Sequence, residues 1–137
     1  MPLIHASAVA AKGRAALIVG ASGSGKSSLA LQLLAFGAAL ICDDQVDLTV
    51  QNGALIAGPA PNIAGMIEAR GVGLLKAPVA GPTPVACVID LNALETERLP
   101  ERERTYHGVS LPLFHKCEGP AWPAAIWLYL SHGPAML

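Results

Sequence analysis

The sequence predicts one α+β domain in which strands dominate and a single phosphate-binding helix packs against them. Apolar segments of strand character outnumber helical ones along the 137 residues. A complete G-x-x-x-x-G-K-[ST] motif over 20–27 separates an apolar segment from a helical one. The composition, 53% apolar and 14% charged, supports a compact core and excludes a disordered chain. No linker or internal repeat divides the sequence, so we expect residues 1–137 to form a single domain.

The first half of the chain holds most of the predicted strands and the clearest helix. In order, we expect a hairpin over 3–10 and 15–19, a helix over 26–36, a buried strand over 39–42, and a hairpin over 46–50 and 54–57. Gly37 suits the position that follows a helix, and Asn52-Gly53 is a strong signal for a tight hairpin turn.

The second half is less regular, because Pro59 and Pro61 interrupt it. We expect a buried strand over 84–91, a solvated loop over the charged run 95–104 and an edge strand over 109–114. Residues 119–137 lack Asp, Glu, Lys and Arg, but three prolines interrupt them and only 124–130 is continuously apolar. A membrane-spanning helix needs roughly 20 apolar residues, so we expect a buried C-terminal helix instead.

Charge and cysteine content narrow the possible partners. The 9 Lys and Arg against 10 Asp and Glu exclude a broad basic surface, so we expect neither nucleic acid nor a membrane as partner. Cys42, Cys87 and Cys117 are widely spaced, which disfavours a zinc site and suits core thiols in a reducing compartment. The first ten residues lack the pattern of a secretory or transit peptide. We therefore expect a cytoplasmic protein whose phosphate chemistry depends on a local site.

That local site is the glycine-rich motif, here called the P-loop (residues 20–27). Its glycines allow successive N–H groups to face a phosphate, and the helix that follows adds partial positive charge. Lys26 is expected to reach the β- and γ-phosphates, and the Ser27 hydroxyl to bind magnesium. An empty Gly/Ser-rich turn is the alternative, but a turn needs neither the lysine nor three glycines. We expect ATP and Mg²⁺ as cofactors, with the nucleotide held by Gly20, Ala21, Ser22, Gly23, Ser24, Gly25, Lys26, Ser27 and Ser28.

Two acids follow the predicted strand 39–42. Asp43 and Asp44 stand 17 and 18 residues after Lys26, at the carboxyl end of that strand, where sheets of this type present their ligands. One carboxylate could hold magnesium while the other acts as general base toward an incoming hydroxyl. A polar turn that caps the strand is the alternative reading.

Taken together, His5, residues 20–27, Cys42-Asp43-Asp44 and the segment Ile67-Glu68-Ala69-Arg70-Gly71-Val72-Gly73 resemble the catalytic domain of bacterial HPr kinase/phosphorylase. The resemblance covers about residues 3–92 and fades beyond them. It implies the HPr kinase/phosphoenolpyruvate carboxykinase-like P-loop fold. It also implies an ATP- and magnesium-dependent kinase that phosphorylates a serine of HPr, the phosphocarrier of the sugar phosphotransferase system, and a homohexameric assembly.

The resemblance also assigns roles to residues that match the family's motifs. It places the catalytic acid/base on Asp43, with Lys26 at the phosphates, and the metal ligands on Ser27, Asp44 and Glu68. His5 matches a family histidine that would orient or charge-balance Asp43, unless it is an ordinary strand histidine.

Two further residues match the family near the phosphates. Ser22 matches a serine that touches the transferred phosphate, or is merely a small residue that the turn tolerates. Arg70 is a phosphate-charge or structural partner, or part of a surface salt bridge.

Three departures from the family pattern limit what the resemblance implies. The first predicted strand begins almost at Met1, so we expect a short form without the N-terminal domain of longer relatives. Ser28 stands where those relatives often have an acidic residue, a mild change. The family's R-P-G-R-N-type segment has no counterpart in 115–120, where Lys116 cannot replace two guanidinium groups. We therefore expect phosphorylase activity to be weak or absent.

Two other functions remain open on sequence grounds. A small-metabolite P-loop kinase would close an arginine-bearing lid, for which Arg98, Arg102 and Arg104 are candidates. A non-catalytic ATP-sensing module would need the P-loop but not the acids. A docking surface for a protein substrate could include 109–114 and Trp122, which are equally suited to the core.

Overall fold

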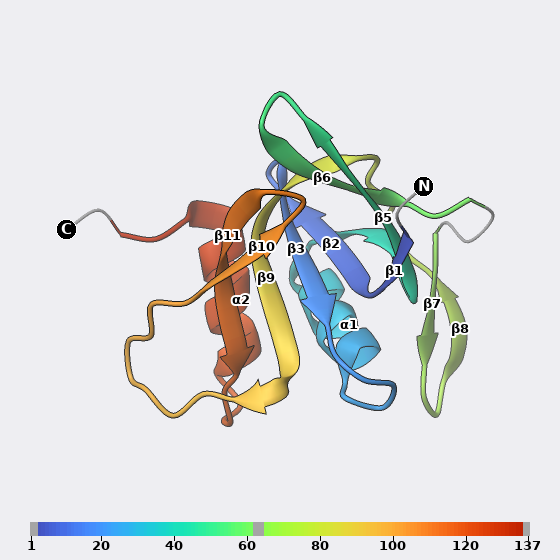
Figure 1. The fold of residues 1–137 in the computed structure, drawn as a ribbon. Coiled ribbons are helices and arrows are strands. Elements are labelled where there is room, and N and C mark those ends of the chain that lie inside the picture. The colour runs from blue at the N-terminus through green and yellow to red at the C-terminus, as the bar shows by residue number, and fades with distance from the viewer. Residues whose placement is uncertain (1–2, 62–64, 136–137) are drawn as a thin grey trace.

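This computed structural model describes residues 3–61 and 65–135, and it confirms the sheet-rich α+β fold (Figure 1). The strands are β1 (Leu3–His5), β2 (Ser7–Ala11), β3 (Arg14–Val19), β4 (Ala39–Cys42), β5 (Gln45–Gln51), β6 (Ala54–Pro59), β7 (Met66–Ala69), β8 (Gly73–Lys76), β9 (Thr83–Leu94), β10 (Glu103–Tyr106) and β11 (Val109–Lys116). The helices are α1 (Lys26–Phe36) and α2 (Trp122–His132).

Among the described residues, nine strands form one sheet and β7 and β8 form a separate hairpin. The main path of the sheet runs β1-β5-β6-β9-β3-β2-β4, and β11 adds to β9 with β10 beyond it. Strand β3 is parallel to β9, which is parallel to β11, whereas β2 is antiparallel to both β3 and β4. The strand that leads into the P-loop therefore lies in the interior of the sheet, where both of its edges are hydrogen-bonded.

Both faces of the central strands are buried, which explains the continuous apolar run 15–19. On one face, Ala16 and Ile18 pack with residues of α1 and α2. On the other, Leu17 and Val19 pack with residues of β5, β6 and β11. Figure 1 shows both helices on the same side of β3 and β9. The two helices and the outer strands thus cover both faces of β3, whose carboxyl end leads into the P-loop.

Most predicted elements are confirmed, and α1 has the bounds that the sequence predicts. The strand over 109–114 is not an edge strand, because β11 pairs with β9 on one side and with β10 on the other. The edge is β10, which forms from the end of the charged run, so that only 95–102 is loop. Exposed Glu103 and Thr105 alternate with half-buried Arg104 and Tyr106, which suits a strand with one solvated face.

Two expectations about burial are wrong in part. Helix α2 is only half-buried, since Ile126 and Leu130 face the core while Leu128 is 60% exposed. Cys42 and Cys87 are buried as expected, and burial raises the pKa of the Cys87 thiol to about 12, but Cys117 is exposed. No helix in the described part of the chain is long and apolar enough to span a membrane.

Candidate active site

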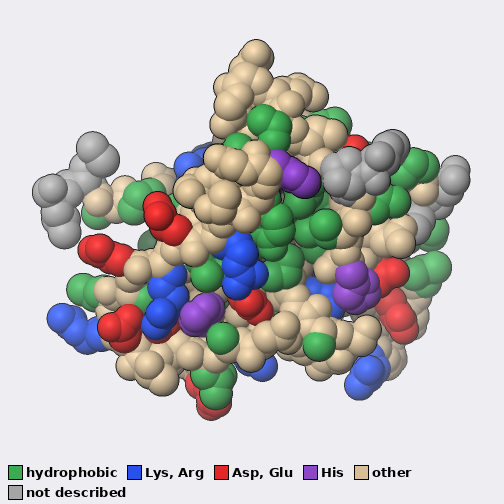
Figure 2. All heavy atoms as spheres, in the orientation of Figure 1, with side chains coloured by type: hydrophobic (Ala, Val, Ile, Leu, Met, Phe, Trp, Pro, Cys, Tyr) green, Lys and Arg blue, Asp and Glu red, His purple; other side chains and the backbone are tan. Residues whose placement is uncertain are grey.

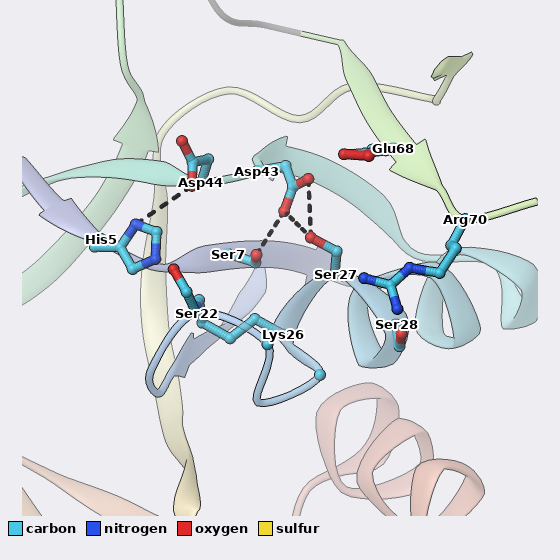
Figure 3. Close-up of a pocket in the computed structure, with 12 residues that line it drawn as sticks. His5, Ser7, Ser22, Lys26, Ser27, Ser28, Asp43, Asp44, Glu68 and Arg70 are labelled. Atoms are coloured by element: carbon cyan, nitrogen blue, oxygen red, sulfur yellow. Dashed lines mark hydrogen bonds and ion pairs between the residues drawn. The ribbon is translucent and has the colours of Figure 1, made fainter. Parts of the chain in front are cut away.

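A cleft of about 360 Å³ lies between the P-loop, the end of β4 and the β7–β8 hairpin (Figure 3). It brings together predicted site residues from four separate segments. Its lining comprises His5, Ser7, Ser22, Gly23, Gly25, Lys26, Ser27, Ser28, Asp43, Asp44, Glu68 and Arg70. Of the residues predicted to bind nucleotide or metal, Gly20, Ala21 and Ser24 do not line this cleft. A volume of this size falls within the range of small-molecule sites, about 300–1,000 Å³.

The P-loop folds around its own lysine. Lys26 is only 7% exposed, and its ammonium donates to the carbonyl oxygens of Gly20 at 2.8 Å and Ala21 at 3.1 Å. These contacts satisfy a buried charge, which would otherwise be costly. Gly20 itself has no room for a side chain, because a Cβ there would lie 2.5 Å from the Ser24 hydroxyl oxygen. The close approach explains why the motif needs glycine at this position.

The start of α1 is an anion site by construction. Gly25 precedes the helix with φ of 104°, a conformation that glycine adopts without strain. The first turn, Lys26-Ser27-Ser28-Leu29, holds no acidic side chain to compensate the partial positive charge of the helix end. Backbone N–H groups and this dipole are therefore available to a phosphate group.

Asp43 is held by two serine hydroxyls. Ser7 donates to one carboxylate oxygen at 2.6 Å, and Ser27 donates to both oxygens at 2.9 and 3.1 Å. Figure 3 shows Asp43 pointing between these two serines. Ser7 was not predicted as a site residue. Its signal is the strand register, because antiparallel pairing of Ala8 with Cys42 brings the preceding Ser7 beside the following Asp43.

His5 contacts Asp44 rather than Asp43, so the expected partner of His5 is corrected. The Nδ1 of His5 lies 3.3 Å from an Asp44 oxygen, and both side chains are at least half-exposed. Asp44 has φ of 77°, in the left-handed region, whereas the strand before it is extended. This turn of the backbone directs the two neighbouring carboxylates to different partners.

Glu68 and Arg70 reach the cleft from the β7–β8 hairpin. Along β7, Ile67 and Ala69 are buried while Met66 and Glu68 are exposed, as expected for a strand with one covered face. Figure 3 shows Glu68 across the cleft from Ser27, and the Arg70 guanidinium extending toward Ser27 and Ser28. Glu68 and Arg70 thus add one negative and one positive charge to the cleft wall.

A magnesium ion fits the donor types of this cleft. Among residues 3–61 and 65–135, no three His, Cys, Asp or Glu side chains lie close enough together to form a metal cage. Mg²⁺ in kinases does not require one, because it keeps waters and combines one or two carboxylates with phosphate oxygens. The Ser27 hydroxyl directs its hydrogen to Asp43, which leaves its oxygen lone pairs for a cation.

A second set of contacts anchors the P-loop from β9. The Asn92 side chain accepts a 2.9 Å hydrogen bond from the Ala21 N–H, and Asp90 accepts one from the Asn92 N–H at 2.8 Å. Arg104 on β10 donates to Asp90 at 2.8 Å. Burial would raise the pKa of Asp90, but the hydrogen bonds from Arg104 and Asn92 outweigh it and hold that pKa below its ordinary value. This chain of contacts was not predicted, because it joins segments about 70 residues apart.

The charged residues outside the cleft do not form a single basic area on the face seen in Figure 2. Lys, Arg, Asp and Glu side chains are interspersed there. Two of the three arginines considered as a lid are engaged in ion pairs, since Arg102 contacts Glu95 and Glu97 and Arg104 contacts Asp90.

Comparison with known proteins gives a consistent result. A family model described as the HPr Serine kinase C-terminal domain matches residues 2–107. An HPr kinase/phosphorylase of Pediococcus pentosaceus is 33% identical over 122 residues, covering 80% of this chain and 39% of that protein. One of Clostridium botulinum is 45% identical over 73 residues, covering 53% of this chain and 24% of that protein.

The fold is also found in a solved structure. The Hpr(Ser) kinase/phosphatase from Coxiella burnetii matches with a TM-score of 0.76 and 26% identity, over 93% of this chain and 92% of that one. The structural match therefore extends past the region in which the sequence motifs lie. This chain spans between about a quarter and two fifths of the length of the curated relatives named above. The chain belongs to the HPr Serine kinase C-terminal domain family.

Proposed function

We propose that this domain is a serine kinase that transfers the γ-phosphoryl group of ATP to a serine of the phosphocarrier protein HPr, and so regulates the phosphotransferase system. Family membership and relatives named HPr kinase/phosphorylase support the substrate. The observation that carries the proposal is the pair of hydrogen bonds that two serine hydroxyls donate to Asp43 beside the P-loop. A substrate serine would present the same functional group to the same carboxylate.

Asp43 is the proton acceptor in this proposal. The seryl hydroxyl gives its proton to the Asp43 carboxylate, its oxygen forms a bond to the γ-phosphorus, and the bond from that phosphorus to the bridging oxygen of ADP breaks. The two serine donors fix the carboxylate in place before substrate arrives, which avoids reorganisation during the reaction. Within residues 3–61 and 65–135, no such pair of hydroxyl donors contacts Asp44, which favours Asp43 for this role.

Lys26 and the start of α1 provide the positive charge. The Lys26 ammonium, which now contacts two loop carbonyls, would turn to the β- and γ-phosphate oxygens. The N–H groups of 23–28 and the helix dipole would hold the remaining oxygens. Positioning and charge neutralisation of this kind account for most of the catalysis in phosphoryl transfer.

We assign the magnesium site to Ser27, Asp44 and Glu68, which line the same cleft. When bound, the ion would supply positive charge that offsets the negative charge of the phosphate groups during transfer. His5, in contact with Asp44, would keep that carboxylate oriented toward the cleft. Ser22, at the exposed tip of the P-loop, and Arg70 would face the transferred phosphate.

The experiment that tests the proposal is transfer of label from γ-labelled ATP, with Mg²⁺, to purified HPr. The matched control is an HPr variant whose target serine is alanine. Label on wild-type HPr alone would support the proposal. No label on either carrier, although ATP binds, would refute it and leave a metabolite kinase or a nucleotide sensor. Molecular mass in solution tests the homohexamer, which we propose from family resemblance.

The metabolite-kinase alternative is less well supported by the structure. Its lid would need free arginines, but Arg102 and Arg104 are engaged with carboxylates of the same chain. A non-catalytic sensor would not need two hydroxyl donors on Asp43.

A further inference from the structure

A second cavity, of about 520 Å³, lies on the other side of the P-loop from the proposed reaction centre. It is bounded by the first two turns of α1, by the end of β11 and by the start of α2. None of the acids of the reaction centre lines it. Its function is therefore separate from proton transfer and metal binding.

The two cavities meet at the P-loop. Gly25 and Ser28 line both of them, so the beginning of α1 is their common wall. A triphosphate with its γ-phosphate near Asp43 would follow the helix start past Ser27 to Ser28. The group attached to the α-phosphate, which in a nucleotide is the nucleoside, would then lie at the second cavity.

The chemistry of the second cavity suits a flat aromatic base and a sugar. Trp122, Leu29 and Leu91 provide an aromatic and aliphatic wall, and Lys116 and Gln32 provide polar groups. Small-molecule sites typically combine an apolar lining with a few polar groups in this way. The Ser24 hydroxyl oxygen, also on this wall, is buried without a hydrogen-bond partner among the residues described.

The topology of the sheet leads to the same place. Strands β3, β9 and β11 are mutually parallel, and their carboxyl ends meet here beside the start of α2 (Figure 1). In sheets of this type, ligands bind outside the carboxyl ends of parallel strands. Strands β2 and β4, which carry the reaction centre, lie on the opposite side of β3.

We infer that the second cavity binds the nucleoside end of the triphosphate, with the base against Trp122 and the polar groups of Lys116 and Gln32 around it. This inference rests on the proposed function only in assuming that the P-loop binds a nucleotide. It assigns nucleotide selectivity to the start of α2 and the end of β11, which lie outside the P-loop motif.

The chain offers a matched pair of reporters, because Trp122 and Trp127 are its two tryptophans. Trp127 packs near Phe36, at the far end of α1, with ring centroids 6.3 Å apart. That end of the 11-residue helix lies about 15 Å from its start at 1.5 Å per residue. Trp127→Phe leaves Trp122 as sole reporter, and Trp122→Phe leaves Trp127.

The experiment titrates each single-tryptophan variant with Mg-ATP and with Mg-tripolyphosphate, which has no nucleoside, and follows tryptophan emission alongside calorimetry. We expect ATP to change the emission of the Trp127→Phe variant alone, and tripolyphosphate to bind without changing either emission. Trp122→Ala should weaken ATP binding about tenfold, the loss typical of a stacked base, and leave tripolyphosphate binding unchanged.

Equal binding of ATP and tripolyphosphate, or an equal response of both variants to ATP, would overturn the inference. If Trp122→Ala fails to fold, the emission of Trp122 in the Trp127→Phe variant and calorimetry of that variant with both ligands still test the inference. A kinase assay without HPr labelling, together with the expected emission change, would refute the proposed substrate and leave the nucleoside site supported. Absence of binding by either ligand would overturn both proposals.

Discussion

The hydroxyl of Ser7 lies 2.6 Å from a carboxylate oxygen of Asp43, and this contact joins β2 to the reaction centre. Ser7 is fully buried at the start of β2, and Asp43 directly follows β4. The two strands pair in a register that places Ala8 opposite Cys42. Strand pairing therefore determines the position of the proposed base.

Ser7→Ala tests whether this contact positions Asp43. We expect kcat to fall about tenfold, with KM for ATP nearly unchanged, because one of two donors to the carboxylate is lost; about 1.4 kcal/mol corresponds to that factor. Steady-state kinetics measure the two constants separately. Ser110→Ala, which removes an exposed serine that contacts Thr105, is the control. A change confined to KM would contradict a positioning role.

Asp43→Asn tests the proton acceptor itself. The amide keeps the size of the side chain but cannot take the seryl proton, so turnover should fall by about 10²–10⁴-fold, the usual contribution of a general base. Calorimetry should show nearly intact ATP binding. Glu103→Gln, on the exposed edge strand β10, controls for loss of charge alone. Undiminished turnover would remove Asp43 from the role.

Lys26→Ala should weaken both binding and turnover, because the same ammonium is expected to contact phosphate before and during transfer. We expect ATP affinity to fall at least about tenfold, the factor of roughly 1.4 kcal/mol, and tripolyphosphate affinity to fall with it. Lys76→Ala, at an exposed position of β8, is the matched control. Normal ATP affinity in the Lys26 variant would exclude this lysine from the phosphate site.

The Glu95 and Arg102 pair predicts how stability depends on pH. Hydrogen bonding to Arg102 lowers the pKa of Glu95 to about 2, below the unfolded value. A lowered pKa stabilises the fold above the unfolded value of about 4.3, and this contribution disappears as pH falls toward 2. Thermal unfolding should therefore separate wild type from Glu95→Gln at pH 6 and bring them together near pH 2, whereas exposed Glu101→Gln should behave as wild type throughout.

We expect phosphate-dependent dephosphorylation of phospho-HPr to be slow or absent. The segment 115–120 offers Lys116 as its one Lys or Arg, and this residue lines the second cavity rather than the reaction centre. Incubation of serine-phosphorylated HPr with the protein and phosphate measures the rate. A rate close to that of the forward kinase reaction would show that other residues perform the reverse chemistry.

The sequence predicted what depends on local patterns. The P-loop and α1 follow from a motif whose glycines and lysine each have a physical role, and the Asn52-Gly53 hairpin follows from turn chemistry. Asp43 and Asp44 were also named in advance, because carboxylates at the end of a strand are conspicuous, whereas Glu68 was named only from the family resemblance.

What the sequence could not predict depends on contacts between distant segments. The pairing of His5 with Asp44 rather than Asp43 follows from one residue with positive φ. The anchor from Asn92 to Ala21 and the partner of Arg104 follow from the alignment of β9 and β10 with the P-loop, and no periodic pattern encodes these contacts. Strand β10 was missed because its charged residues resemble those of the loop before it.

The place of β3 between β2 and β9 also determines when the phosphate site can form during synthesis. Its neighbour β9 ends at residue 94, about two thirds of the way along the chain, and supplies the Asn92 that anchors the P-loop. In a nascent chain that has not yet emerged beyond residue 94, one edge of β3 lacks the complete strand that pairs with it. Because pairing of strands so far apart in sequence closes a long loop, it is slow compared with formation of α1. The P-loop sequence therefore emerges from the ribosome well before β9 and Asn92 can fix the conformation in which it binds phosphate.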